Sequence, residues 1–169
     1  MKLTKRFDSN EGKHLIEGIH FVLHCHHYNT LIHRAIVSTP FLDGKEFIFQ
    51  TVAQDFAQSL PRIVQSQKLS GKDAILSACS EFYSLLGFGK MDLSALSATG
   101  GRAVSTSSHL ASGYLAKWGK QDQPVDDFGR GFVAAAWATA FGKDVKVCKV
   151  VQTRCIAKGD STGEFTVEV

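Results

Sequence analysis

Residues 145–169 read VKVCKVVQTRCIAKGDSTGEFTVEV, and this stretch decides the fold. From Glu164 to Val169, apolar and polar side chains alternate strictly, which is the period of a strand that buries one face. Residues 145–157 form a second predicted strand before it. The connector 158–163 (KGDSTG) has the residue types of a turn. The stretch therefore predicts two strands joined by a turn at the end of the sequence.

Upstream of this stretch, the helical spacing of apolar residues predicts helices at about residues 29–39, 45–68, 70–86 and 126–141. Pro61 is expected to kink or end the second of these helices. Two further strands are predicted at residues 91–98 and 102–109. The order of elements predicts an α+β fold, with a mainly antiparallel sheet packed against a layer of helices. We expect one domain over residues 1–169, in which residues 1–15 are a loose polar segment.

Composition and charge exclude several classes of protein. The sequence has 169 residues, of which 44% are hydrophobic and 21% are charged, and its formal net charge is +3. These values are typical of a globular protein. The weak, mixed charge gives no basis for binding nucleic acid or an anionic membrane. No apolar run approaches the roughly 20 residues of a membrane span, and no secretory signal is recognisable, so a cytoplasmic protein is expected.

The C-terminal third resembles the 4-vinyl reductase domain family. That family has a Gly-rich helix, then a strand with a cysteine, a Gly-Asp turn and a last strand. The corresponding segments here are residues 124–132 (PVDDFGRGF), 152–160 (QTRCIAKGD) and 164–167 (EFTV). Residues 107–114 (SSHLASGY) fit the preceding element. The resemblance covers roughly residues 70–169.

The resemblance implies both a fold and a ligand class. The family includes sensor domains that bind aromatic compounds, and its fold is similar to that of vesicle-tethering (transport protein particle) subunits, with a hydrophobic internal pocket. A homodimer is therefore also expected. Many members hold zinc with an acidic residue and cysteines near the C-terminus. Here Gln152 and Gly163 occupy two of those positions and only Cys155 remains, so we expect the usual zinc site to be absent.

Histidines are concentrated near the N-terminus, where the first 33 residues contain six of the seven. If residues 19–28 form a strand, which we slightly favour, His20, His24 and His26 share one face. If they form a helix, His20, His24 and His27 do. Neutral imidazole binds iron, copper and zinc well. The cluster therefore predicts a transition-metal site made by these four histidines. The alternatives are hydrogen bonding to backbone and water, or to an organic ligand.

Four further residues are predicted to contact a ligand: Tyr28, Asn29, His109 and Cys155. The leading hypothesis is a small-molecule-binding protein with a histidine-rich metal site. If the protein is an enzyme, the metal would act on a small organic substrate by redox or Lewis-acid chemistry. One alternative is a metal-free module that binds an aromatic or hydrocarbon ligand, and another is a homodimeric assembly subunit. The sequence assigns no catalytic residue.

Overall fold

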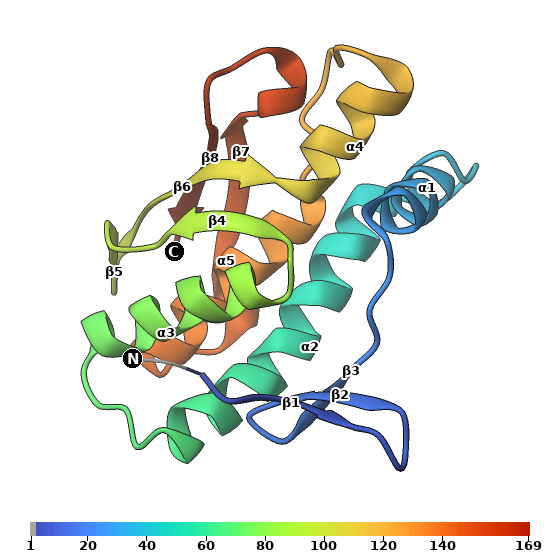
Figure 1. Cartoon of the computed structure of the whole chain (residues 1–169). Coiled ribbons are helices and arrows are strands. Elements are labelled where there is room, and N and C mark those ends of the chain that lie inside the picture. The colour runs from blue at the N-terminus through green and yellow to red at the C-terminus, as the bar shows by residue number, and fades with distance from the viewer. Residues whose placement is uncertain (1–2) are drawn as a thin grey trace.

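The computed structural model describes residues 3–169, which contain two antiparallel sheets (Figure 1). The first is a meander of β1 (Lys5–Asp8), β2 (Lys13–Ile16) and β3 (Ile19–Phe21). The second has the order β4-β6-β8-β7, and β5 pairs with β6. Its strands are β4 (Gly89–Asp92), β5 (Leu96–Ser97), β6 (Gly100–Ser108), β7 (Lys149–Arg154) and β8 (Gly163–Glu168).

Helices fill the space between and beside the sheets. They are α1 (His26–Val37), α2 (Gly44–Ser66), α3 (Lys72–Leu85), α4 (His109–Trp118) and α5 (Asp127–Phe141). Short 3-10 turns, η1 (Val145–Val147) and η2 (Ile156–Lys158), flank β7. α5 packs against α2, α3 and the strands β7 and β8, whereas α1 lies at the edge of the molecule beside α2 and α4 (Figure 1). Within the described residues, no helix is both long and apolar enough to cross a membrane.

The core is centred on α5, which has ten buried residues. A helix that is apolar on all faces belongs in an interior, and this one packs closely against α2. Gly131 permits that approach, because a Cβ atom there would lie 2.7 Å from the carbonyl oxygen of Phe49. The indole N–H of Trp137 donates to the carbonyl oxygen of Ser97 at 2.8 Å, so this fully buried polar group is satisfied.

The sequence prediction of an α+β fold with a mainly antiparallel sheet is confirmed. β7 and β8 pair as antiparallel strands, and Phe165 and Val167 of the alternating segment point into the core. Burial of every second side chain fixes the register, because a slip of one residue would expose these two side chains.

Two local predictions were wrong, and one was wrong in part. Residues 3–15 are not a loose segment: they include β1 and most of β2, and the meander continues to Ile16, which is buried. Residues 19–28 form neither one strand nor one helix, because β3 ends at Phe21 and α1 begins at His26. α2 continues through Pro61 to Ser66, so Pro61 does not end the helix. The buried side chains of Leu60 and Ile63 on either side offset the hydrogen bond that proline cannot donate.

We expect Gly131→Ala to destabilise the fold, although alanine favours helix by about 1 kcal/mol. The added methyl group would lie 2.7 Å from Cβ of Val52 as well as from the Phe49 carbonyl oxygen. Overpacking of this kind costs ~1–3 kcal/mol, so the free energy of unfolding in urea should fall. Ser77→Ala, at an exposed position of α3, is the control and should leave it unchanged or slightly higher. A Gly131→Ala variant as stable as the wild type would show that α2 and α5 are not in close contact.

Candidate functional site

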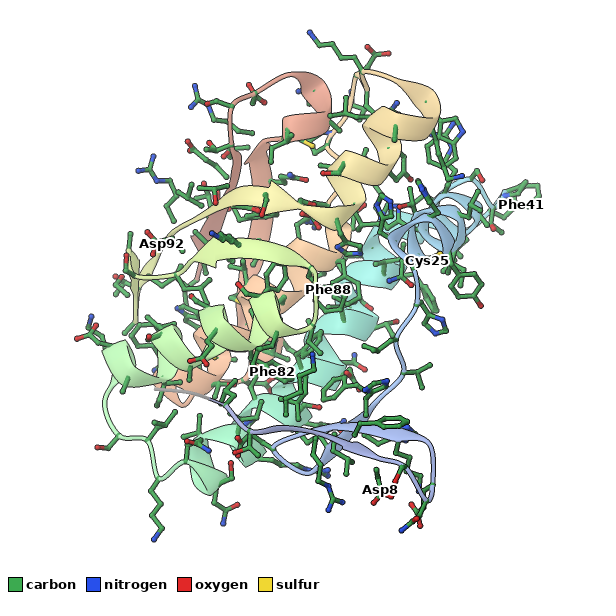
Figure 2. All side chains as sticks on the ribbon, in the orientation of Figure 1. Asp8, Cys25, Phe41, Phe82, Phe88 and Asp92 are labelled. Carbon is green, nitrogen blue, oxygen red and sulfur yellow. The ribbon has the colours of Figure 1, made fainter. Side chains whose placement is uncertain are left out.

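A cavity of about 370 Å³ lies beneath α1. Its walls come from α1, α2, the residues between β3 and α1, residues 86–88, and the first turns of α4 and α5. The volume is within the range of small-molecule pockets, ~300–1,000 Å³. The lining is mainly aliphatic and aromatic and includes Phe21, Ile32, Ile36, Phe47, Phe88 and Phe128. In Figure 2, Phe88 lies in the interior, whereas Phe41 projects from the loop after α1 into solvent.

Among the polar residues that line the cavity are three of the predicted site residues, His24, Asn29 and His109. The lining also includes His33, which the sequence analysis did not select. Asn29, Ile32, His33 and Ile36 recur at i, i+3, i+4 and i+7 of α1 and so form one helical stripe. That spacing was visible in the sequence, but the polar types at its first and third positions concealed it.

His109 is the first residue of α4, held where β6 ends. The Ser108 hydroxyl caps the helix by accepting from the backbone N–H of Ala111 at 3.2 Å. Burial lowers the pKa of His109, and the negative charge of Asp126 offsets part of this lowering. The ring is therefore neutral near pH 7. Nδ1 of His109 lies 3.3 Å from the carbonyl oxygen of Phe88. In the tautomer that donates from Nδ1 to this oxygen, Nε2 is an acceptor.

Two further polar atoms are buried without a partner. The Tyr83 hydroxyl and Oδ2 of Asp126 have no hydrogen-bond partner among residues 3–169. Burial raises the pKa of Tyr83 well above its usual value, and Asp126 raises it further. Unpaired buried polar atoms are costly, so they often accompany a site for water or a ligand. The negative charge of Asp126 raises the pKa of Tyr83 and also acts on that of His109.

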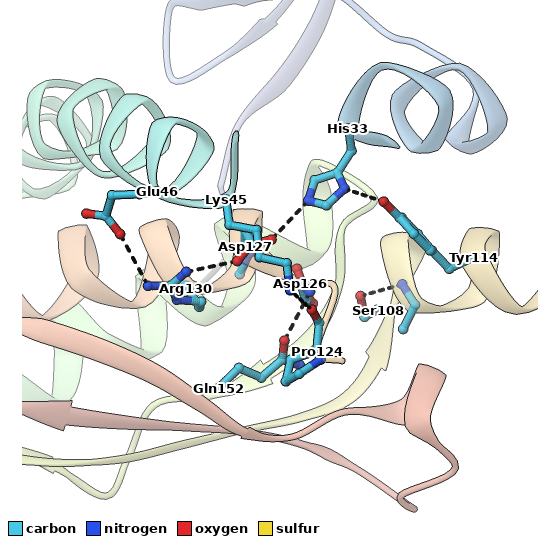
Figure 3. Close-up of polar contacts among 12 residues, drawn as sticks. His33, Lys45, Glu46, Ser108, Tyr114, Pro124, Asp126, Asp127, Arg130 and Gln152 are labelled. Atoms are coloured by element: carbon cyan, nitrogen blue, oxygen red, sulfur yellow. Dashed lines mark hydrogen bonds and ion pairs between the residues drawn. The ribbon is translucent and has the colours of Figure 1, made fainter. Parts of the chain in front are cut away.

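His33 joins α1 to α4 and α5 (Figure 3). Its Nδ1 lies 2.8 Å from the Tyr114 hydroxyl, and its Nε2 lies 3.3 Å from Oδ2 of Asp127. The second contact has the distance of an ion pair, but no aligned hydrogen bond forms between these two atoms. We therefore treat it as electrostatic. All three side chains are nearly inaccessible to solvent.

Arg130 holds the other side of Asp127. Its Nη1 donates to Oδ1 of Asp127 at 2.9 Å, and its Nε donates to the carbonyl oxygen of Val150 at 3.0 Å. Its Nη2 lies 3.6 Å from Glu46, and its guanidinium stacks over Phe49 at 4.7 Å. A buried carboxylate needs such pairing, because an isolated charge in the interior is strongly destabilising. The position of Asp127 is thus fixed by α5 and β7.

The four predicted metal ligands lie at the surface. His20 is on β3, His24 precedes α1, and His26 and His27 form its first turn. The rings of His26 and His27 are 4.0 Å apart, and repulsion from His26 lowers the pKa of His27. Among residues 3–169, no three His, Cys, Asp or Glu side chains are grouped as metal ligands. The metal site stays a prediction.

The other predicted ligand residues lie outside the cavity. The ring of Tyr28 lies 4.7 Å from that of His24 on the exposed side of α1. Cys155 is fully buried in a small separate cluster with Ala111 and Tyr114. Gln152, which replaces the family's acidic residue, accepts a hydrogen bond from the backbone N–H of Asp126 at 3.0 Å. Gln152 therefore helps to position the start of α5.

No protein-family model and no curated protein matches this sequence. The fold is similar to that of the phenol-responsive sensory domain of the transcription activator PoxR, in a crystal structure with phenol. That match has a TM-score of 0.78 at 12% identity and covers 96% of this chain and 83% of that one. A vinyl-4-reductase family protein from Methanocaldococcus jannaschii matches with a TM-score of 0.51 at 12% identity, covering 83% and 76%. These likenesses confirm the predicted resemblance at the level of the fold.

The lowered pKa of His109 predicts a pH dependence of stability. Its folded-state pKa lies below the usual histidine value of 6.5, so below about pH 6.5 the unfolded state binds more protons. The free energy of unfolding should therefore fall as the pH drops through this range, by up to ~1.4 kcal/mol per unit of difference in pKa.

Urea unfolding at about pH 7.5 and about pH 5.5 measures this loss, and His109→Gln should reduce it. His20→Gln, at an exposed position of β3, is the control and should leave the loss unchanged. An equal loss in wild type and His109→Gln would mean that His109 is not buried as described.

Proposed function

We propose that this chain binds a small, neutral, largely apolar organic molecule of the aromatic or hydrocarbon class in the cavity beneath α1. The observation that carries the proposal is the lining, in which several aromatic and aliphatic side chains surround only a few polar groups. A charged ligand would lose hydration without gaining a partner there, because the residues that line the cavity include no Asp, Glu, Lys or Arg.

His109 and Asn29 are the groups that would orient such a ligand. A neutral His109 with a free Nε2 accepts a hydrogen bond from a hydroxyl or amine, whereas the Asn29 amide can donate or accept. An apolar pocket with a few polar groups is the usual form of a small-molecule site. The sensory-domain neighbour, whose structure contains phenol, supports the aromatic class by analogy of fold.

Two probes are suitable. Binding of phenol can be measured by calorimetry, and binding of the dye N-phenylnaphthylamine by fluorescence. We expect saturable binding of at least one of them, and we expect Thr51→Trp, which fills the cavity from α2, to weaken it by about tenfold or more. Gln58→Trp, at an exposed position of the same helix, is the matched control. Equal binding by both variants would place the ligand elsewhere.

The transition-metal cofactor (iron, copper or zinc) is tested separately by elemental analysis of untagged protein. Our proposal expects much less than one metal ion per chain, and ligand binding that chelators leave unchanged. If the protein instead contains one metal ion per chain, and a His24→Ala, His26→Ala double variant loses that ion, the metal-dependent enzyme hypothesis replaces our proposal. His14→Ala, a histidine outside the predicted ligand set, is the control.

A homodimer is a second expectation, and exposed apolar side chains around α1 favour it. Tyr28, Leu31, Phe41 and Leu42 are each at least 41% exposed. Between residues 18 and 42, Arg34 is the only Asp, Glu, Lys or Arg. Uncharged apolar surfaces of this kind mark interaction sites. For the wild-type protein, light scattering should give twice the chain mass of 18.4 kDa. Leu31→Glu, which places a charge on this exposed surface, should give the mass of a monomer. A wild-type protein with the mass of a monomer would refute the dimer.

A further inference from the structure

The wall of the cavity has two parts that differ in how they are attached. α2, α5 and residues 86–88 are joined to the main core through partly or fully buried apolar side chains such as Val52, Phe128 and Phe88. The other part is the segment 22–36, made of an irregular stretch and α1. This segment contributes three of the five polar residues of the lining, His24, Asn29 and His33.

α1 has few apolar anchors. Its buried residues are Thr30 and His33, both polar, whereas α5 has ten buried residues. Leu31 and Ile32 are 49% and 41% exposed. Ile36 and Val37 are only partly buried where they pack on the core. Since burial of apolar area is the main stabilising term in folding, α1 is held less strongly than the other long helices.

The N-terminal end of α1 adds little to its stability. Its N-cap residue, Cys25, makes no side-chain hydrogen bond, and the first turn contains no acidic residue that would interact favourably with the helix dipole. That turn instead contains His26 and His27, and repulsion from His26 lowers the pKa of His27. Residues 22–25 before α1 and 38–43 after it form no helix or strand. Both flanks are therefore suited to act as hinges.

Besides the apolar contacts of Ile36 and Val37, two contacts made by its buried polar residues hold α1 against α4 and α5. His33 lies between Tyr114 of α4 and Asp127 of α5, as described above (Figure 3). Thr30 packs against Gly113 of α4 so closely that a Cβ atom at Gly113 would overlap it. The partners of His33 have further contacts of their own, because Arg130 pairs with Asp127 and the ring of Trp118 packs edge-on against that of Tyr114, with centroids 4.8 Å apart. Of the elements joined by His33, α1 has the fewest buried apolar side chains.

We propose that residues 22–43 form a movable lid over the cavity, and that His33 is the positioning residue that latches the lid to α4 and α5. Opening separates His33 from Tyr114 and Asp127 and gives a ligand access to the cavity. The idea that the lid admits a ligand rests on the proposed function. The motion itself is a property of the ligand-free chain and is tested without one.

Amide hydrogen exchange on the ligand-free chain is the first test. We expect the amides of residues 28–37 to exchange through local opening, at least about tenfold faster than those in the middle of α2 and α5. His33→Leu should accelerate exchange in α1 by about tenfold more and leave α5 unchanged, and Tyr114→Phe, which removes one contact, should have a smaller effect of the same kind. His33→Gln, which keeps a donor and an acceptor, should restore part of the protection.

The outcome that overturns the lid is α1 exchanging only with global unfolding, at the rate of α5. Acceleration of equal size in α1, α2 and α5 on His33→Leu would do the same, because it would assign His33 a purely structural role. Exchange measured at two protein concentrations distinguishes protection of α1 by a second copy from protection by closure of the lid. A dimer across α1 would slow exchange in α1 more at the higher concentration, because more of the protein is associated.

A reducible cross-link gives the second test. In a Cys25→Ser background, Thr30→Cys and Gly113→Cys would place two thiols on α1 and α4, where the present Cβ of Thr30 and an ideal Cβ at Gly113 are 3.1 Å apart. A disulfide prefers ~3.8 Å, so a small shift suffices. Oxidation should slow exchange in α1 and slow the association of N-phenylnaphthylamine by at least about tenfold, and reduction should reverse both effects.

Unchanged exchange and association on oxidation would mean that α1 does not open. If neither phenol nor the dye binds but α1 exchanges locally and is protected by the cross-link, the lid stands and the proposed aromatic ligand class fails. The single variants Thr30→Cys and Gly113→Cys, which cannot form this cross-link, control for the substitutions themselves.

Discussion

The carboxylate of Asp127 is buried in the first turn of α5, and a buried charge is tolerated only when it is paired. Arg130 supplies the pair and connects it to β7 through the carbonyl oxygen of Val150. The second carboxylate oxygen faces His33 of α1. One charge therefore joins the central helix, the edge of the sheet and the helix that covers the cavity. The start of α5, which also contributes Phe128 to the lining, is fixed by this arrangement.

The cavity lies between this polar cluster and an aromatic core. The ring of Phe88 is 4.4 Å from that of Phe128 and 5.0 Å from that of His109. Such contacts give a rigid, apolar floor, whereas α1 gives a roof that is anchored mainly by polar groups. The combination suits a ligand that is bound by apolar contact and oriented by one or two hydrogen bonds. The fold shared with a phenol-responsive sensory domain accommodates this arrangement without requiring the same residues.

The sequence predicted those parts of the fold whose pattern reports burial directly. The alternation of Phe165 and Val167 identified β8, and the apolar positions after Asp127 identified α5. Pattern failed where tertiary contacts decide: Pro61 was expected to kink or end its helix, but α2 continues through it because its neighbours are buried. Of the site residues predicted from residue type and local context, His24, Asn29 and His109 line the cavity, although His24 was predicted as a metal ligand. His33 was missed, because nothing local reveals that Asp127 and Tyr114, about 80 to 95 residues away, converge on it.

For the histidine cluster, the sequence pattern predicted a grouping that the fold does not form. Its spacing suggested a shared face, but β3 ends at Phe21, so His20 and His27 lie on different elements. The histidine that matters most for the architecture is the one at the inner face of α1. A continuous apolar inner face would have anchored α1 by burial of apolar area, which is not directional and resists opening. Polar contacts are short-ranged and directional, and they can be exchanged for water when the helix moves. Anchoring by His33 therefore holds α1 in one position while keeping the free energy of its local opening low.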